Sequence, residues 1–179
     1  MKIAILVGNP KPQSRTLQTA ESVAAVVESL IPEVRPQRLV IELAGHADRL
    51  FAWPEPKLDE LTAEVAGSDV LIVASPTYKA TYTGMLKAFL DRYGSNGLAG
   101  VVAVPVMTGA AGDHALAVEN HLRPLLVELG ATVPARGLYM VMPRMDELSA
   151  VTAAWGAAAA PVLRPAIAAR LSSPEGGRA

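Results

Sequence analysis

Hydroxyl and cationic side chains gather in one short segment near the N-terminus. It reads Asn9-Pro-Lys-Pro-Gln-Ser-Arg-Thr16 and carries the hydroxyls of Ser14 and Thr16 and the charges of Lys11 and Arg15. An apolar run precedes it and a segment of helical periodicity follows, so its donors should lie at a helix N-terminus, where anions bind. Neutral donors beside cations favour a phosphate over a metal. The segment is neither a Walker A motif nor a G-x-G-x-x-G fingerprint, and an ordinary Ser-capped turn is the structural alternative.

Two further segments could hold a flat heteroaromatic ring. Ser75-Pro-Thr-Tyr-Lys-Ala-Thr-Tyr-Thr-Gly84 places Tyr78 and Tyr82 beside several backbone amides after an apolar run. Pockets for such rings combine apolar walls with a few polar contacts, so backbone groups would read the ring edge and the tyrosines would cover a face. Thr108-Gly-Ala-Ala-Gly112 is small enough for close backbone approach. Alternatively, the tyrosines only pack their loop, and the small segment is a turn before a helix that Asp113 caps.

Apolar runs that alternate with helical patterns should position these segments. The expected strands cover residues 2–8, 35–43, 69–75, 100–107 and 138–141. The expected helices run from residue 17 to near Ile31 and over 57–67, 84–93 and 113–129. This order predicts an α/β fold with a parallel sheet covered on both faces, because right-handed crossovers place the helices there. Ligands of such sheets bind outside the carboxyl ends of the strands, where all three segments should meet.

The C-terminal part is rich in alanine and contains prolines. Pro161 and Pro165 should break or kink any helix there. We expect residues 1–171 to form a single domain and residues 172–179 to be a disordered tail, since 179 residues are enough for one domain with a real core but short for two.

Composition excludes several classes of function. The net charge is −1 and no basic block is present, which argues against a nucleic-acid partner. There is no cysteine, hence neither a disulfide framework nor thiol chemistry. No apolar run approaches the roughly 20 residues of a membrane helix. The chain enters its first strand without a basic and apolar leader, so we expect a cytoplasmic protein without a membrane partner.

In order and spacing, the three segments and the stretch from Gly84 to Asp91 resemble the NAD(P)H-dependent FMN reductases of flavodoxin-like fold. The resemblance is strongest to the reductases of two-component alkanesulfonate monooxygenases and extends from residue 1 to about Val141. It implies a doubly wound five-stranded parallel sheet of order 2-1-3-4-5, FMN and NAD(P)H as cofactors, a homodimer or homotetramer, and a flavin-dependent monooxygenase as partner.

The resemblance also implies roles for individual residues. The family's first loop binds the FMN phosphate, and its counterparts here are Lys11, Ser14, Arg15 and Thr16, with Asn9 in place of the usual Ser. The family's second loop holds the isoalloxazine and ribityl chain, and its counterparts are Pro76, Thr77, Tyr78 and Lys79. The third loop approaches the ring edge, and its counterparts are Thr108, Gly109 and His114.

One helix departs from the family pattern. The stretch from Ala115 to Pro124 resembles the helix in which the alkanesulfonate-type reductases carry an inserted Tyr that makes a π-bulge at the tetramer interface. Asn120 or His121 stands there instead, although Pro124 alone could distort the helix one turn earlier. We interpret His121 as an interface or surface residue rather than a catalytic one.

No Ser-His-Asp, paired-carboxylate or metal-ligand cluster emerges from the three segments, as expected if a cofactor carries the chemistry. The resemblance then implies hydride transfer from nicotinamide to flavin N5, with binding residues and no catalytic side chain. Two alternatives stay open: a flavodoxin-type electron carrier, and an FMN-containing reductase of a quinone, azo dye or metal oxyanion. The carrier is disfavoured because flavodoxins are strongly acidic, whereas this chain has 16 basic and 17 acidic residues.

Overall fold

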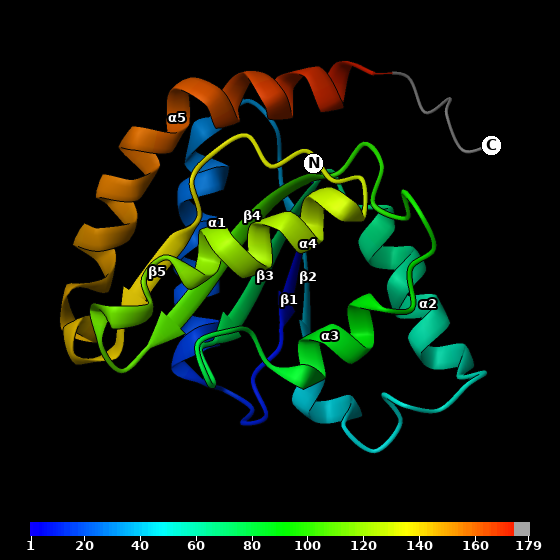
Figure 1. Ribbon diagram of the computed structural model, residues 1–179. Coiled ribbons are helices and arrows are strands. Elements are labelled where there is room, and N and C mark those ends of the chain that lie inside the picture. Colours follow the sequence, from blue (N-terminus) through cyan, green and yellow to red (C-terminus); the bar gives the residue numbers. More distant parts are fainter. Residues whose placement is uncertain (174–179) are drawn as a thin grey trace.

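A five-stranded parallel sheet forms the centre of the molecule in the computed structural model, which describes residues 1–173. Its strand order is β2-β1-β3-β4-β5, which confirms the expected doubly wound arrangement. The strands are β1 (Lys2–Val7), β2 (Gln37–Glu42), β3 (Val70–Pro76), β4 (Val102–Gly109) and β5 (Leu138–Val141). In Figure 1 their arrows point toward the lower edge, where the connecting loops gather.

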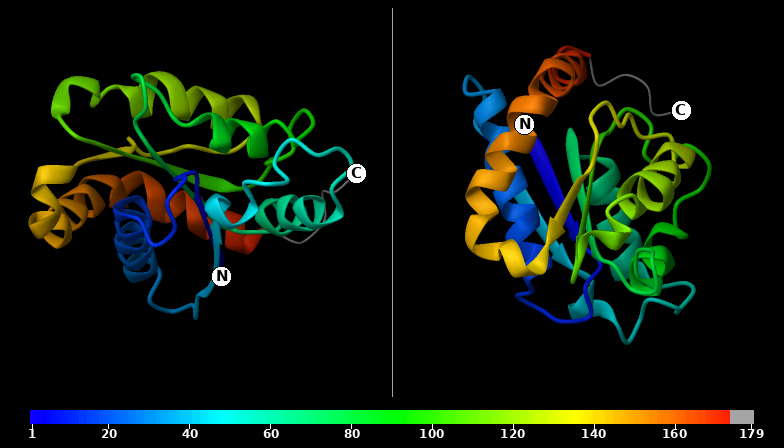
Figure 2. Two further views of the ribbon diagram at one scale, coloured as in Figure 1. Left: turned by 90° about the horizontal axis from the view of Figure 1, so that it is seen from below. Right: turned by 60° about the vertical axis from the view of Figure 1, so that its left-hand side comes forward.

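Helices cover both faces of the sheet. The α-helices are α1 (Arg15–Leu30), α2 (Pro56–Ala66), α3 (Gly84–Leu90), α4 (Arg123–Glu128) and α5 (Leu148–Ser172). Short 3₁₀ turns are η1 (Leu43–His46), η2 (Gly112–His114) and η4 (Met142–Glu147), and η3 (Val118–Leu122) is a π-helix. Figure 2 shows α1 and α5 on one face of the sheet and α2, α3 and α4 on the other.

Each face of the sheet has its own hydrophobic core. Ile72 of β3 packs with Val23 of α1 and Leu163 of α5, whereas the adjacent Leu71 packs on the other face with Phe89 of α3. Every residue of β3 and β4 is buried. Burial on both faces explains why these strands are continuous apolar runs rather than alternating ones.

The predicted single α-helix over residues 113–129 is wrong. The chain forms the 3₁₀ turn η2, then the π-helix η3, and only then α4. The backbone N–H of Arg123 donates to the carbonyl of Val118, five residues earlier. Pro124 has no N–H and therefore cannot donate to the carbonyl of Asn120 four residues earlier. The wide turn lies one turn before Pro124, where the proline was expected to distort the helix.

Strand ends also differ from the prediction. β3 includes Pro76, and β4 includes Thr108 and Gly109, which the sequence pattern placed in a loop. Pairing explains the extension, because Pro76 is aligned with Thr108 and Gly109 with Val141 of β5. The neighbouring strands therefore carry these residues to the edge of the sheet in regular geometry.

The last helix passes both prolines without a break. α5 contains Pro161 and Pro165, and Figures 1 and 2 show that it bends midway, as a missing backbone donor permits. It includes Ser172, the first residue of the expected tail, and Ser173 caps it. Residues 174–179 of that tail lie outside the described residues. Over residues 1–173, no helix is both long enough and apolar enough to span a bilayer.

Candidate functional site

A cavity of about 520 Å³ opens at the carboxyl end of the sheet. Loops that follow β1, β3, β4 and β5 surround it, as expected for a doubly wound sheet. All predicted site residues except Lys79 and His114 line it, namely Asn9, Lys11, Ser14, Arg15, Thr16, Pro76, Thr77, Tyr78, Thr108 and Gly109. Its volume is in the range of pockets that bind cofactor-sized ligands. The three segments singled out by their sequence thus meet in one place.

The first loop is held in shape by Asn9. Its Oδ1 accepts from the Lys11 backbone N–H at 2.9 Å, and its Nδ2 donates to Thr16 Oγ1 at 2.9 Å. Ser14 caps α1, since its Oγ accepts from the Leu17 N–H at 3.2 Å. The cap and the anion site are compatible. The first N–H groups of a helix have no intrahelical acceptor, so those of Arg15 and Thr16, at the N-terminus of α1, remain for an anion.

Two buried hydroxyls join the first loop to the end of β4. Thr16 Oγ1 lies 2.9 Å from Thr108 Oγ1, and the two residues are 1% and 2% exposed. Thr16 Oγ1 already accepts from Asn9, and either hydroxyl can donate to the other. Whichever does so, one hydroxyl proton of the pair remains for a further acceptor. The bottom of the cavity therefore offers a neutral hydrogen-bond donor.

The second loop contributes a buried polar atom to the cavity wall. Thr77 donates its backbone N–H to the carbonyl of Thr108 at 2.7 Å. Its Oγ1 is buried and has no hydrogen-bond partner within residues 1–173. Leaving such a group unpaired costs about 1–3 kcal/mol. A ligand with polar atoms at this wall would remove that cost, so the residues present fit a polar cofactor.

A tight turn presents Tyr78 to the cavity. Tyr78 and Thr81 exchange backbone hydrogen bonds of 2.9 and 3.3 Å around Lys79 and Ala80, whose φ angles are +52° and +67°. Left-handed backbone at two residues with side chains is strained, and such strain concentrates at ligand sites. Tyr78 is 50% exposed and lines the cavity, whereas Lys79 sits at the tip of the turn and does not.

Tyr82 does not join Tyr78 at the cavity. It packs against the core cluster between the sheet and the α2–α3–α4 layer. The two tyrosines therefore do not cover one ligand face together. Among residues 1–173, Tyr78 is the aromatic residue that lines the cavity.

In the third segment, the absence of a side chain at Gly109 makes room for the neighbouring Tyr139. A Cβ built on Gly109 would overlap the phenol oxygen of Tyr139 and lie 2.7 Å from its Cζ. Substitutions at Gly109 would thus press on Tyr139 of β5. His114 lies in η2 and does not line the cavity.

Sequence reasoning missed part of the cavity wall. Pro12, Gln13, Ala110 and Met142 also line it. Gln13 has φ +50° and donates its N–H to Glu42 Oε2 at 2.8 Å, at the end of β2. Met142 begins the turn after β5, and its position directly after the last parallel strand was the signal that could have identified it.

Lys87 and Asp91, one turn apart on the exposed side of α3, form an ion pair. Its hydrogen bond is the main reason why the pKa of Lys87 is raised above the ordinary lysine value. A pair with both side chains this exposed contributes little to stability. It lies apart from the residues that line the cavity.

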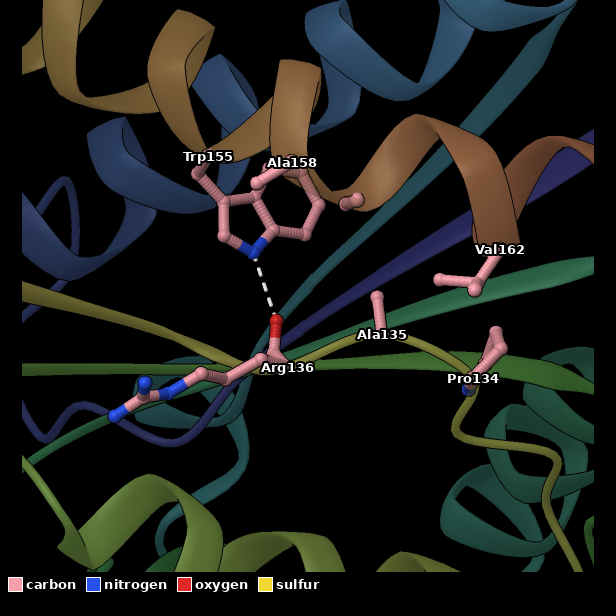
Figure 3. Close-up of a pocket in the computed structure, with 7 residues that line it drawn as sticks. Pro134, Ala135, Arg136, Trp155, Ala158 and Val162 are labelled. Carbon is pink, nitrogen blue, oxygen red and sulfur yellow. Dashed lines mark hydrogen bonds between the residues drawn. The ribbon is translucent and has the colours of Figure 1, made fainter.

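A second, smaller cavity of about 170 Å³ lies between α5 and residues 134–136, which lead into β5. Figure 3 shows Trp155 of α5 with its indole N–H directed to the carbonyl of Arg136, a bond of 2.8 Å. The other walls are aliphatic, as the side chains of Pro134, Ala135 and Val162 show. This groove is too small and too apolar for a charged cofactor. In the described part of the chain, no three His, Cys, Asp or Glu residues are grouped to hold a metal ion.

Comparison with known proteins agrees with this geometry. Residues 1–143 match the family described as NADPH-dependent FMN reductase. The chain is 34% identical over 140 residues to an FMN reductase (NADPH) of Escherichia coli K12, covering 78% of this chain and 72% of the relative. It is 29% identical over 152 residues to the NADH-dependent FMN reductase SfnF of Pseudomonas putida, covering 82% and 81%. The apo crystal structure of an NADH:FMN oxidoreductase, EMOB, is similar with a TM-score of 0.77 and 32% identity over 98% of this chain and 91% of that one.

Proposed function

Because the chain belongs to the family of NADPH-dependent FMN reductases, we propose that it binds FMN in the cavity at the carboxyl end of the sheet and transfers hydride to it from NAD(P)H. The observation that carries the proposal is the convergence of an anion-binding helix end and an unpaired buried hydroxyl on one cavity of suitable volume. When bound, FMN supplies the hydride-accepting ring atom N5. The chain supplies binding and orientation.

The first loop holds the phosphate end of FMN in this proposal. The N–H groups at the start of α1 and the Ser14 hydroxyl donate to phosphate oxygens, and Lys11 and Arg15 balance their charge. Asn9 holds this loop in shape through its bonds to Lys11 and Thr16, and its second Nδ2 hydrogen is available to the ligand. The Thr16–Thr108 pair keeps one hydroxyl proton that is not used between the two residues. This proton can donate to the ribityl chain, which joins the phosphate to the ring.

The other loops hold the ring. Tyr78 lies against one side, and Pro76, Thr77, Thr108 and Gly109 form the wall at the ring edge, where the unpaired Thr77 Oγ1 can bond to the ring. Lys79 and His114 reach FMN only if their loops move, since neither lines the cavity. The side of the ring away from this wall stays open to solvent, where a nicotinamide can stack within the roughly 3–3.5 Å that hydride transfer requires.

Steady-state oxidation of NADPH and NADH, with and without added FMN, tests the proposal. We expect oxidation that depends on added FMN and saturates with it, because an open cavity allows the flavin to exchange. Oxidation of a quinone without added FMN would instead indicate a bound prosthetic group and the quinone-reductase alternative. FMN binding without any oxidation of either nicotinamide would indicate an electron carrier.

The proposal extends to assembly, partner and location. Leu116, just before η3, and Val127, in α4, are 57% and 54% exposed. The segment from Leu116 to Val127 therefore offers an apolar contact for a homodimer or homotetramer. The apolar side chains of α3 contribute less, because they are buried in the chain's own core. A flavin-dependent monooxygenase would receive the reduced FMN, in the cytoplasm where NAD(P)H is available.

Light scattering of the protein and of its Leu116→Lys/Val127→Lys variant tests the assembly. We expect the unmodified protein to be an oligomer and the variant, with its two introduced lysines, to be a monomer. A monomeric unmodified protein at micromolar concentration would contradict this part of the proposal. The FMN-dependent rate measured with and without a candidate monooxygenase tests the partner separately.

A further inference from the structure

We propose that Tyr139 is a positioning residue, which holds the wall formed by residues 109–111 in the conformation that accepts a flavin ring. This inference rests on the proposed function, since it concerns the same cavity. Tyr139 itself does not line the cavity. It acts through Gly109 and Ala110, which do, and through the carbonyl of Ala111.

The phenol of Tyr139 occupies the space behind Gly109. Tyr139 is aligned with Met107 in the β4–β5 pairing, and its ring packs against the core on the α2–α3–α4 face. From there the ring extends toward the carboxyl end of β4, where a Cβ on Gly109 would overlap its oxygen and lie 3.4 Å from Cε1. Only a residue without a side chain lets the β4 backbone rest on this ring.

A hydrogen bond fixes the next part of the wall. Tyr139 Oη donates to the carbonyl of Ala111 at 3.2 Å. Ala111 ends the short loop between β4 and η2 and has extended backbone geometry. The ring of Tyr139 therefore supports the loop at Gly109, and its hydroxyl holds the same loop at Ala111.

The end of β4 is held from its two faces by different kinds of contact. On the α1 face, Thr16 Oγ1 bonds to Thr108 Oγ1. On the opposite face, Tyr139 supports Gly109. The Thr16 contact belongs to the phosphate loop, whereas Tyr139 is linked to the ring side of the cavity. Loosening Tyr139 should therefore affect recognition of the ring, which FMN and riboflavin share, and leave recognition of the phosphate intact.

Removing the hydroxyl tests this assignment by binding alone. For Tyr139→Phe we expect FMN and riboflavin to bind more weakly by the same factor of about 2 to 10, as loss of one hydrogen bond implies. Flavin fluorescence titration measures both ligands. Tyr93→Phe is the matched control, because Tyr93, just after α3, donates its Oη–H to the Thr62 carbonyl of α2 at 3.1 Å. The control should lose stability without changing either affinity.

A second pair of variants tests the contact with Gly109. Gly109→Ala should weaken both flavins by at least about 10-fold, because its Cβ displaces the phenol and shifts the wall. Tyr139→Leu lacks the ring atoms that this Cβ meets. Gly109→Ala combined with Tyr139→Leu should therefore bind flavins better than Gly109→Ala alone, a non-additivity expected of residues in contact.

The outcomes separate this inference from the proposed function. The positioning role is wrong if the unmodified protein binds flavin and the Tyr139→Phe variant has the same affinity for both flavins as the unmodified protein. The reductase proposal would then still stand. A loss confined to FMN, or additive effects in the double variant, would also overturn the positioning role. If the unmodified protein binds no flavin at all, the proposed function fails first.

Discussion

The cavity at the carboxyl end of the sheet and the smaller groove beside Trp155 are built in different ways by the same fold. The cavity lies where four loops leave the carboxyl ends of parallel strands, and hydroxyls, amides and two cations surround it. The groove lies between one helix and the segment before β5, and the hydrogen bond that connects these two walls joins Trp155 to the Arg136 carbonyl. Loops at the strand ends can present backbone donors, whereas a helix packed on a sheet presents only side chains.

Strain is distributed in the same way. Of the four non-glycine residues with positive φ in residues 1–173, Gln13, Lys79 and Ala80 lie in loops that form the cavity, and Asn96 lies in the connection between α3 and β4. The residues that line the groove are not among those with positive φ in the described part of the chain. Tight packing of α5 holds the groove in a relaxed conformation, while the cavity keeps loop conformations that are costly without a ligand. Variants in the two regions should therefore separate binding from stability.

The largest difference is expected from charge. Lys11→Ala/Arg15→Ala should weaken FMN by about 10- to 100-fold, since charge-assisted contacts are strong but these side chains are exposed and screened by salt. Riboflavin, which lacks the phosphate, should bind as before. Arg136→Ala/Arg164→Ala removes the same amount of charge, from the groove wall at Arg136 and from α5 at Arg164, and should change the affinity for neither ligand. Equal losses of FMN in both double variants, measured by fluorescence titration, would mean that only net charge matters.

A smaller difference is expected from two hydroxyl pairs, of which Thr16–Thr108 is buried and Ser22–Thr152 is partly buried. Thr16→Val leaves Asn9 and Thr108 without their partner, which should destabilise the protein by about 1–3 kcal/mol and weaken FMN about 5- to 10-fold. Thr152→Val breaks the 2.8 Å contact between Thr152 and Ser22, where α5 packs on α1. It should destabilise without affecting FMN. Urea unfolding and titration of both variants decide this, and an FMN loss in Thr152→Val would refute the separation of the two regions.

The smallest effect is expected in the groove itself. Trp155→Phe removes the bond to the Arg136 carbonyl, worth about 0.5–1.5 kcal/mol, and should lower the midpoint of thermal unfolding by about 1–5 °C. FMN affinity and the FMN-dependent rate should not change. Calorimetry and steady-state kinetics check both statements. A change in the rate at unchanged affinity would show that the groove is coupled to the cavity.

Much of this protein could be predicted from local sequence patterns. Continuous apolar runs marked β3 and β4 because both faces of these strands are covered, and their alternation with helical segments specified the parallel sheet and its ligand edge. The polar segment before α1 was recognisable as an anion site because hydroxyls and cations preceded a helical period. Pro124 indicated where the helix after η2 would deviate, since the missing N–H is a property of the residue itself.

Other features depend on contacts between segments far apart in the chain. The side-chain position of Gly109 faces Tyr139, and the amide of Asn9 bonds to Thr16 and to the Lys11 backbone. Met142 reaches the cavity because β5 ends beside β4, and Tyr82 leaves it because its ring packs into the core. Sequence alone determined the residue types, the strand and helix periods and the order of the loops. Only the tertiary structure decided which side chains face the cavity, because the direction of a side chain is set by strand register and by what already fills the space on each side of the sheet.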